Sequence, residues 1–362
     1  MKRIIFTVTN DLNYDQRMQR ICSSVAAAGF NVVLLGRQMK ESLPLTGQSF
    51  SQKRLYCIFQ KGPLFYIEFN LRLFFCLLFQ KADAICAIDL DTILPVYFVS
   101  LFRKKKRLYD AHELFTEQKE IVTRPFIHRC WLAIERFAVP KFPIGYTVNE
   151  FIAGELARRY GVHYLVIRNL PVYRELPEQR ATEKFIIYQG AVNEGRSFET
   201  LIPAMREIDC RLRIFGTGNF LEQARQLIRT NQLEDKIILE GMALPEELLK
   251  ITPQAYLGIM LFESTGLNQY QSLSNRFFDY IMAGIPQLCV AYPAYQQIND
   301  QFQIACMIPD TATETIVKAL QEMLSDQSLH ERLQRNCLSA RKILNWENEE
   351  KKLKDLYGQL WE

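Results

Sequence analysis

The sequence has 362 residues, of which 48% are hydrophobic and 23% charged, and its formal net charge at pH 7 is +4. This length allows two domains, and the composition is that of a globular protein rather than a disordered one. The net charge is small and the aromatic residues are not interleaved with basic ones, so no nucleic-acid partner is expected.

The first part of the chain alternates between strand-like and helical patterns. The expected strands are residues 3–8, 31–35, 84–88, 107–110 and 144–148. A helical pattern over residues 15–28 ends at Gly29, and further helical stretches separate the later strands. This alternation predicts βαβ units and a parallel sheet.

Residues 64–79 are very apolar, but Glu68, Asn70 and Arg72 interrupt them and the stretch is short for a membrane span. Two interpretations stay open: a helix partly buried in the core, and a face that touches a membrane surface. The basic run 103–107 supports the second, because cations attract anionic lipid, although a solvated helix end also explains it.

After residue 170 the pattern breaks and then restarts. Residues 171–184 are polar and contain two prolines, which is typical of a linker. Strands are expected at residues 185–189, 212–215, 236–239, 257–261 and 287–291. The sequence therefore predicts an N-terminal domain (1–170), a C-terminal domain (185–345) and a final helix (346–362).

Nine cysteines are scattered along the chain, and none forms a Cys-x-x-Cys pair. Most lie in apolar patterns, so we interpret them as reduced thiols of a cytoplasmic protein. The apolar run after Met1 ends at Thr9, which is too early for a signal peptide.

The segment from Ser274 to Pro286 has the pattern of a short helix with a polar start and a Gly-x-Pro end. Ser274 is a good N-cap, because its hydroxyl can accept from the free backbone N–H groups of the first turn. A helix N-terminus attracts phosphate, and Arg276 adds a forked cation beside it. Asp279 follows one turn later, where its carboxylate can accept hydrogen bonds from ribose hydroxyls. An ordinary capped helix would explain the pattern equally well. The candidate donor-binding residues here are Ser274, Asn275, Arg276 and Asp279.

Two glycine-containing loops follow expected strands of the C-terminal domain. Gly190 ends one strand, and Arg196 on the same loop can clamp a diphosphate. Gly216 and Gly218 follow the next strand, where glycine lets the backbone approach a phosphate or a sugar. The alternatives are a surface arginine and a tight turn.

Four further candidates lie after strands of the N-terminal domain. His112 and Glu113 follow the strand at 107–110, and Asp15 and Arg17 follow the first strand. We assign Asp15, Arg17 and Glu113 to acceptor binding, with cleft electrostatics as an alternative role for Asp15 and Arg17. An acid that caps the helix, and a histidine held in a structural hydrogen bond, are the alternatives.

Residues 274–286 resemble the nucleotide-sugar motif of GT-B glycosyltransferases of the retaining family four, the glycosyl transferases group 1. Arg276 stands at the motif's Lys and Asp279 at its Glu, and the other matching positions are Tyr280, Ala283, Gly284 and Pro286. In the family's loop pattern Gly-Arg-x-x-x-x-Lys-Gly, Gly190 and Arg196 match the first Gly and the Lys.

The sequence departs from the family at two positions. Gln271 stands where the family often has a first glutamate, and Ala191 stands where the loop pattern has its Arg. Asp89 and Asp91 look like a metal-binding Asp-x-Asp of the other, GT-A fold. Because Asp91 precedes a helical pattern, helix capping explains them better.

The resemblance implies two Rossmann-like domains whose parallel sheets face each other across a cleft. The C-terminal domain would hold a nucleotide-diphosphate sugar, and a glycan or lipid-linked acceptor would enter from the N-terminal domain. Transfer would proceed with retention and without metal, in polysaccharide biosynthesis. His112 would contact the transferred sugar, and Arg196 would stabilise the leaving diphosphate.

A sugar-nucleotide epimerase and a non-catalytic nucleotide-sugar-binding partner are the alternatives. The protein would be cytoplasmic, with peripheral contact at the inner face of the membrane. No cofactor is expected, and without a G-x-G-x-x-G after the first strand a dehydrogenase is not favoured.

Overall fold

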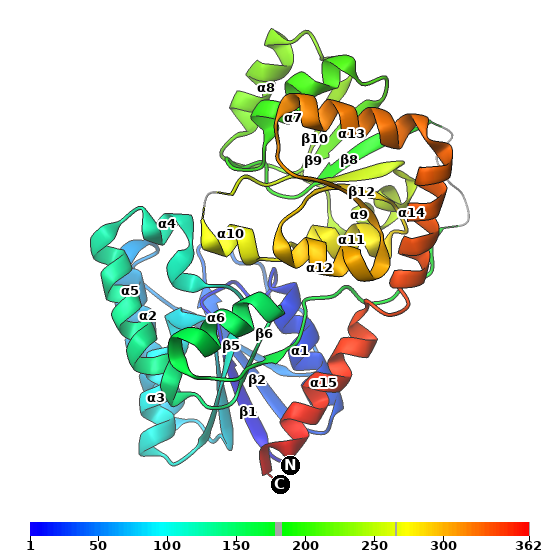
Figure 1. The fold of residues 1–362 in the computed structure, drawn as a ribbon. Coiled ribbons are helices and arrows are strands. Elements are labelled where there is room, and N and C mark those ends of the chain that lie inside the picture. The colour runs from blue at the N-terminus through cyan, green and yellow to red at the C-terminus, as the bar shows by residue number, and fades with distance from the viewer. Residues whose placement is uncertain (178–182, 265, 362) are drawn as a thin grey trace. The chain divides into compact units, whose positions relative to one another are not determined.

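A computed structural model describes residues 1–177, 183–264 and 266–361, so part of the expected linker (178–182) lies outside the described residues. The chain divides into two compact units (Figure 1). The first unit contains Met1–Asn169 and Glu349–Glu362, and the second contains Leu170–Asn348. We describe each unit separately.

The first unit is built on a seven-stranded parallel sheet in the order β3-β2-β1-β4-β5-β6-β7. Its register places Ile4 of β1 opposite Val32 of β2 and Ala84 of β4. The middle of β1 (Ile4, Ile5 and Phe6) and the whole of β4 are apolar and buried, as expected for strands covered on both faces. The strands are β1 (Arg3–Thr7), β2 (Asn31–Gln38), β3 (Ser51–Tyr56), β4 (Ala84–Ile88), β5 (Lys106–Ala111), β6 (Gly145–Thr147) and β7 (Leu165–Val166).

Helices pack on this sheet in two groups. Helix α15 lies against α1, where Ser24 Oγ donates to Glu350 2.5 Å away, and Tyr357 of α15 packs on Phe6 of β1. Helix α3 contacts both α2 and α5, and this second group lies away from α1 and α15 (Figure 1). The helices are α1 (Gln16–Ala27), α2 (Gly62–Phe79), α3 (Ile93–Phe102), α4 (Lys119–Val122), α5 (Pro125–Ala138), α6 (Glu150–Tyr160) and α15 (Trp346–Gly358).

The second unit repeats this topology with a six-stranded parallel sheet in the order β10-β9-β8-β11-β12-β13. Successive residues of β8 face opposite layers: Ile186 and Tyr188 join one buried cluster, and Phe185 and Ile187 join the other. The strands are β8 (Phe185–Gln189), β9 (Arg211–Phe215), β10 (Ile237–Gly241), β11 (Leu257–Met260), β12 (Gln287–Val290) and β13 (Ala305–Ile308). The helices are α7 (Phe198–Ala204), α8 (Leu221–Thr230), α9 (Pro245–Ile251), α10 (Leu267–Gln271), α11 (Asn275–Met282), α12 (Pro293–Phe302), α13 (Thr313–Ser325) and α14 (Gln327–Ala340).

The prediction of two Rossmann-like parallel-sheet domains is confirmed. Both sheets reverse their strand order beside the first strand, between β1 and β4 and between β8 and β11. In open α/β sheets, ligands bind beyond the carboxyl ends of the strands at such a reversal. The loops that follow β1, β4 and β5, and those that follow β8, β9 and β11, are therefore the places to look for function.

Candidate functional site

Three glycines bring two loops of the second unit into direct backbone contact. Gly190 (φ +124°) follows β8 and Gly216 (φ +145°) follows β9, and both adopt angles that favour glycine. A Cβ on Gly216 would collide with the carbonyl oxygen of Gly190, and one on Gly218 would collide with the carbonyl oxygen of Val192. The two loops are therefore in close backbone contact, and a side chain at Gly216 or Gly218 would push them apart.

Arg276, in the first turn of α11, lies beside these loops. Its guanidinium stacks on the Tyr188 ring at 4.0 Å from the ring centroid, and its Nη1 donates to the carbonyl oxygen of Gln189 at 2.9 Å. A Cβ on Gly190 would lie 3.7 Å from the same Nη1. The side chain is buried, yet within the described residues no carboxylate lies within ion-pair distance of it. A buried cation without a counter-charge is costly, so this position favours an anionic guest.

Arg196 approaches Arg276 through a shared aromatic ring. The guanidinium carbons of Arg196 and Arg276 lie 4.5 Å and 5.3 Å from the centroid of Phe262. The carbonyl oxygen of Phe262 accepts from the Tyr292 hydroxyl at 2.6 Å, and the Phe262 ring packs on Tyr295. The structure thus brings together, over one aromatic ring, the two arginines that the sequence assigned to the diphosphate.

The start of α11 differs from the expected cap. Ser274 occupies the N-cap position, but its side chain makes no capping hydrogen bond, and its backbone N–H donates to the Tyr295 hydroxyl at 3.0 Å. The prediction that its hydroxyl caps the helix is therefore wrong. Asn275 is exposed at the first helical position. Asp279 accepts a 3.4 Å hydrogen bond from Gln189 Nε2, which turns the carboxylate toward the end of β8.

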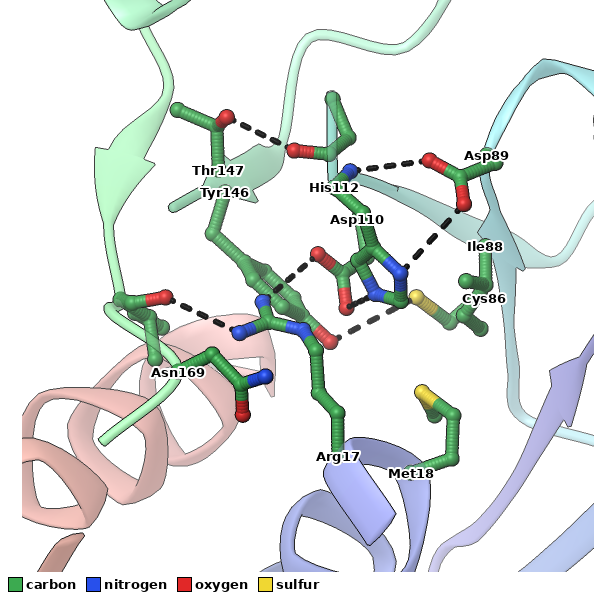
Figure 2. A network of polar contacts seen from close by, with 12 residues as sticks. Arg17, Met18, Cys86, Ile88, Asp89, Asp110, His112, Tyr146, Thr147 and Asn169 are labelled. Carbon is green, nitrogen blue, oxygen red and sulfur yellow. Dashed lines mark hydrogen bonds and ion pairs between the residues drawn. The ribbon is translucent and has the colours of Figure 1, made fainter. Parts of the chain in front are cut away.

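A second polar cluster, shown in Figure 2, surrounds His112 in the first unit. Asp110 accepts from His112 Nε2 at 3.0 Å and pairs with Arg17 Nη2 at 3.0 Å. Asp89, at the end of β4, accepts from the backbone N–H of His112 at 2.9 Å and lies 3.3 Å from its Nδ1. Both ring nitrogens thus face carboxylates, so contact with a sugar hydroxyl requires one of these bonds to be shared or exchanged.

These carboxylates set the charge of His112. Burial alone would lower the pKa of the imidazole, but the charges of Asp110 and Asp89 outweigh burial and raise the pKa to about 9. Burial likewise tends to raise the pKa of Asp110, but Arg17 and His112 overcome it and lower the pKa. His112 is therefore an imidazolium at neutral pH, and it can donate hydrogen bonds but cannot accept a proton.

The comparisons with known proteins concern the family and the fold of the chain. Residues 172–338 match the profile of the family described as glycosyl transferases group 1. The chain superposes on sucrose-phosphate synthase from Thermosynechococcus elongatus with a TM-score of 0.82, at 17% identity over 100% of this chain and 99% of that one. For Anabaena HepE, whose structure contains UDP and glucose, the TM-score is 0.77 at 9% identity over 99% and 100%. For WaaG, a glycosyltransferase of lipopolysaccharide biosynthesis, it is 0.75 at 13% identity over 98% and 99%. Among curated proteins the sequence has no match.

The chain has the GT-B fold. The resemblance to the group 1 glycosyltransferases is confirmed over residues 172–338. The predicted donor residues of the second unit all lie inside the matched range. Those of the first unit lie outside it, and their roles depend on the fold and on their contacts.

In this GT-B chain, the predicted acceptor residues have structural contacts of their own. Asp15 is the N-cap of α1 and accepts from the Met18 N–H, which is the capping alternative. Arg17 is buried and donates hydrogen bonds to Asp110 and to the carbonyl oxygen of Ile167. Glu113 accepts from Gln118 Nε2. Contact of these three residues with an acceptor stays a prediction.

The capping explanation of Asp89 and Asp91 is wrong. Neither makes a side-chain capping bond; Asp89 holds His112, and Asp91 accepts from Thr9 Oγ1 at 2.5 Å. Within residues 1–177, 183–264 and 266–361, no group of three or more His, Cys, Asp or Glu side chains is placed to hold a metal ion.

Sequence reasoning missed the residues that support the predicted ones. Phe262 lies after β11, and no local pattern links it to Arg196 or Arg276. Asp89 and Asp110 could have been found from topology, because β4 and β5 are expected neighbours and the ends of parallel neighbours meet at one edge of the sheet.

Proposed function

We propose that this protein transfers a glycosyl group from a nucleoside diphosphate sugar to a glycan or lipid-linked acceptor. The observation that carries the proposal is the buried Arg276, which lies beside the close-packed glycine loops and lacks a carboxylate partner among the described residues. A diphosphate supplies the missing negative charge, and the backbone N–H groups of glycine loops and helix starts suit its oxygens.

The chemistry follows from charge development. Negative charge grows on the diphosphate as the glycosidic bond breaks, so fixed cations stabilise the transition state more than the bound substrate. Arg196 and Arg276 are held on Phe262 and need little rearrangement when that charge appears. We propose that the departure and attack occur on one face of the sugar, with retention and without metal, as in the family that the sequence resembles.

Asp279 is the proposed ribose-binding residue, because its carboxylate lies near the end of β8, one turn from Arg276. Ala191 removes one cation of the family's loop, which increases the share of charge that falls to Arg196 and Arg276. His112 is proposed to donate a hydrogen bond to the transferred sugar from its imidazolium form. The cytoplasmic location stays a prediction.

The test begins with binding and then measures turnover. A thermal-shift panel of UDP, GDP, TDP and ADP, with their sugars, should find a ligand that raises the melting temperature by mass action. UDP is the first choice, since solved GT-B neighbours contain UDP or UDP-glucose. The selected sugar nucleotide is then assayed for donor hydrolysis and for transfer to glycan acceptors.

The outcomes separate three functions. Glycosyl transfer with a retained anomeric configuration supports the proposal. Release of a free epimerised sugar without acceptor would identify an epimerase, and tight binding with no turnover would identify a non-catalytic partner. No stabilisation by any nucleotide would contradict the donor site itself.

A further inference from the structure

Helix α2 has two apolar sides, and only one of them is used in the core. Phe65, Phe69, Leu73 and Leu77 are buried at a spacing of four residues. The opposite side exposes Leu64 (54%), Ile67 (57%), Leu71 (56%), Phe75 (56%) and Phe79 (81%). A helix on the surface of a water-soluble domain normally carries polar residues there, so this outer side indicates a partner.

The exposed apolar surface continues over two neighbouring helices. A chain of aromatic contacts passes from α2 through α3 to α5, with ring centroids 5.5 to 6.5 Å apart. Its rings are Phe75, Phe74, Phe102, Phe98 and Phe137. Phe102 is 65% exposed and Phe126, at the start of α5, is 72% exposed. We call this surface of α2, α3 and α5 the aromatic face.

The charges on the aromatic face are arranged by sign. Arg72 of α2 is exposed, and so are Arg129 and Arg136 of α5. Helices α2, α3 and α5 carry two acids among them, and Glu135 is buried and bonded to Thr116 and Tyr160. Glu68 accepts from two backbone N–H groups and pairs with Arg72, so the unbalanced positive charge comes from Arg129 and Arg136. The face therefore presents apolar rings bordered by cations.

A second border of cations lies where α2 and α3 end. Lys81 and Lys104 are exposed there, and Lys141 places its ammonium 3.8 Å from the centroid of Phe137. Apolar rings bordered by cations fit a bilayer interface, where rings enter the acyl region and cations meet anionic headgroups.

We propose that the aromatic face docks in the plane of an anionic lipid bilayer. Helix α2 is long and apolar enough to cross a membrane by length and composition. However, spanning would strip Phe65, Phe69, Leu73 and Leu77 from the core of the first unit, so the helix lies on the membrane instead. A second copy of the chain is a poorer occupant, because both copies of the face would carry the same excess of positive charge.

Vesicle binding of the full chain tests the proposal, without any sugar nucleotide, so its outcome is independent of the proposed function. Vesicles of phosphatidylglycerol and phosphatidylcholine (1:1) are compared with vesicles of phosphatidylcholine alone, in co-sedimentation at 0.1 M NaCl. We expect at least tenfold tighter binding to the anionic vesicles, and a loss of this preference at 0.5 M NaCl as the cations are screened.

Two double variants separate the apolar and the charged contributions. Phe75→Ser with Phe79→Ser should weaken binding about 100-fold, at about tenfold for each ring. Arg129→Glu with Arg136→Glu should weaken it about 25-fold or more, at about fivefold for each charge. Matched controls lie in the second unit, where Met242→Ser (77% exposed) and Lys318→Glu should change binding by less than twofold.

Three results would overturn the proposal. The first is equal or absent binding to the two kinds of vesicle. The second is unchanged binding by either double variant with an unaltered melting temperature. The third is a dimer in sedimentation equilibrium that Phe75→Ser with Phe79→Ser separates into monomers, together with no vesicle binding, since the aromatic face would then be a contact between copies.

Discussion

Both units place charged side chains beyond the ends of their central strands, but the two clusters balance this charge differently. In the first unit, the cations of His112 and Arg17 both contact the carboxylate of Asp110. In the second, Arg276 is equally buried but contacts aromatic rings, a thioether and a carbonyl oxygen. The first cluster is complete without a ligand, whereas the second leaves Arg276 without a carboxylate partner among the described residues, and there we propose that a diphosphate supplies the counter-charge. The same topology thus supports a fixed polar network in one unit and the proposed anion site in the other.

The largest effect is expected from removing the negative charge of Asp110, which completes the first cluster. Asp110→Asn leaves the buried Arg17 and the partly buried His112 without their shared carboxylate and should destabilise the first unit by about 3–5 kcal/mol. The measurement is urea unfolding followed by hydrogen exchange of β1 and β5. Glu240→Gln, which breaks the partly exposed pair with Arg213, is the control and should cost less than about 1 kcal/mol. Equal effects would show that the cluster is no more than a surface ion pair.

Substitution of Arg196 in the second unit should lower the catalytic rate rather than the stability. Arg196→Ala should lower kcat by about 100- to 1,000-fold, as for loss of a preorganised group facing the leaving charge, with Arg196→Lys recovering only part. Arg213→Ala is the control, because Arg213 also lies over two aromatic rings, about 5 Å away, but outside the glycine loops. Near-normal kcat in Arg196→Ala, in transfer or donor hydrolysis, would move the donor site elsewhere.

The charge of His112 gives a pH dependence that the second cluster lacks. Its pKa of about 9 lies above the ordinary value of 6.5. Its contribution to stability, up to about 3 kcal/mol, is therefore fully present below pH 6.5 and is lost as the pH rises through about 9. An NMR titration of the ring reports this directly, and His112→Gln should flatten the stability profile over that range. A ring pKa near 6.5 would contradict the carboxylate clamp.

A variant of Asp279 tests whether this residue contacts the ribose of the proposed donor. Asp279→Asn should weaken binding of the free nucleoside diphosphate by about 1–3 kcal/mol, because a charged hydrogen bond to ribose is lost. Calorimetric titration measures this change. Asp300→Asn on α12 is the control, since Asp300 also accepts from a glutamine side chain. An unchanged affinity would assign Asp279 to holding Gln189 only.

The smallest expected effect is that of chelation. If cations of the protein balance the diphosphate, EDTA should leave turnover unchanged to within about twofold. Turnover that EDTA abolishes, and that Mg²⁺ or Mn²⁺ restores, would show that metal shares this task.

How much of this could be predicted follows from what local sequence encodes. The central strands could be located in the sequence because burial on both faces of the sheet leaves a continuous apolar run, as in β4 and β8. The sequence prediction missed β3, β7 and β13: β3 is a polar edge strand, β7 has only two residues, and β13 has only four residues and is half-buried. Edge strands carry a weaker pattern because one of their sides is not paired.

The site was predictable where chemistry is local and obscure where it is not. The glycines of the loops, and Arg276 with Asp279 on one helix, were visible from their spacing. Arg17 and Asp110 are 93 positions apart, so their ion pair depends on strand order. The positive φ of Asp89 (+54°) belongs to a residue type that tolerates this angle, and no local pattern marked it.

The division of the chain also has a consequence for its synthesis. Tyr357 and Phe6 pack together in the first unit, although the whole of the second unit is translated between them. At about 5–20 residues per second, the ribosome needs about 10 to 40 seconds to make that intervening segment. Nascent chains should therefore complete the later unit before the earlier one, with β1 exposed to chaperones until α15 emerges.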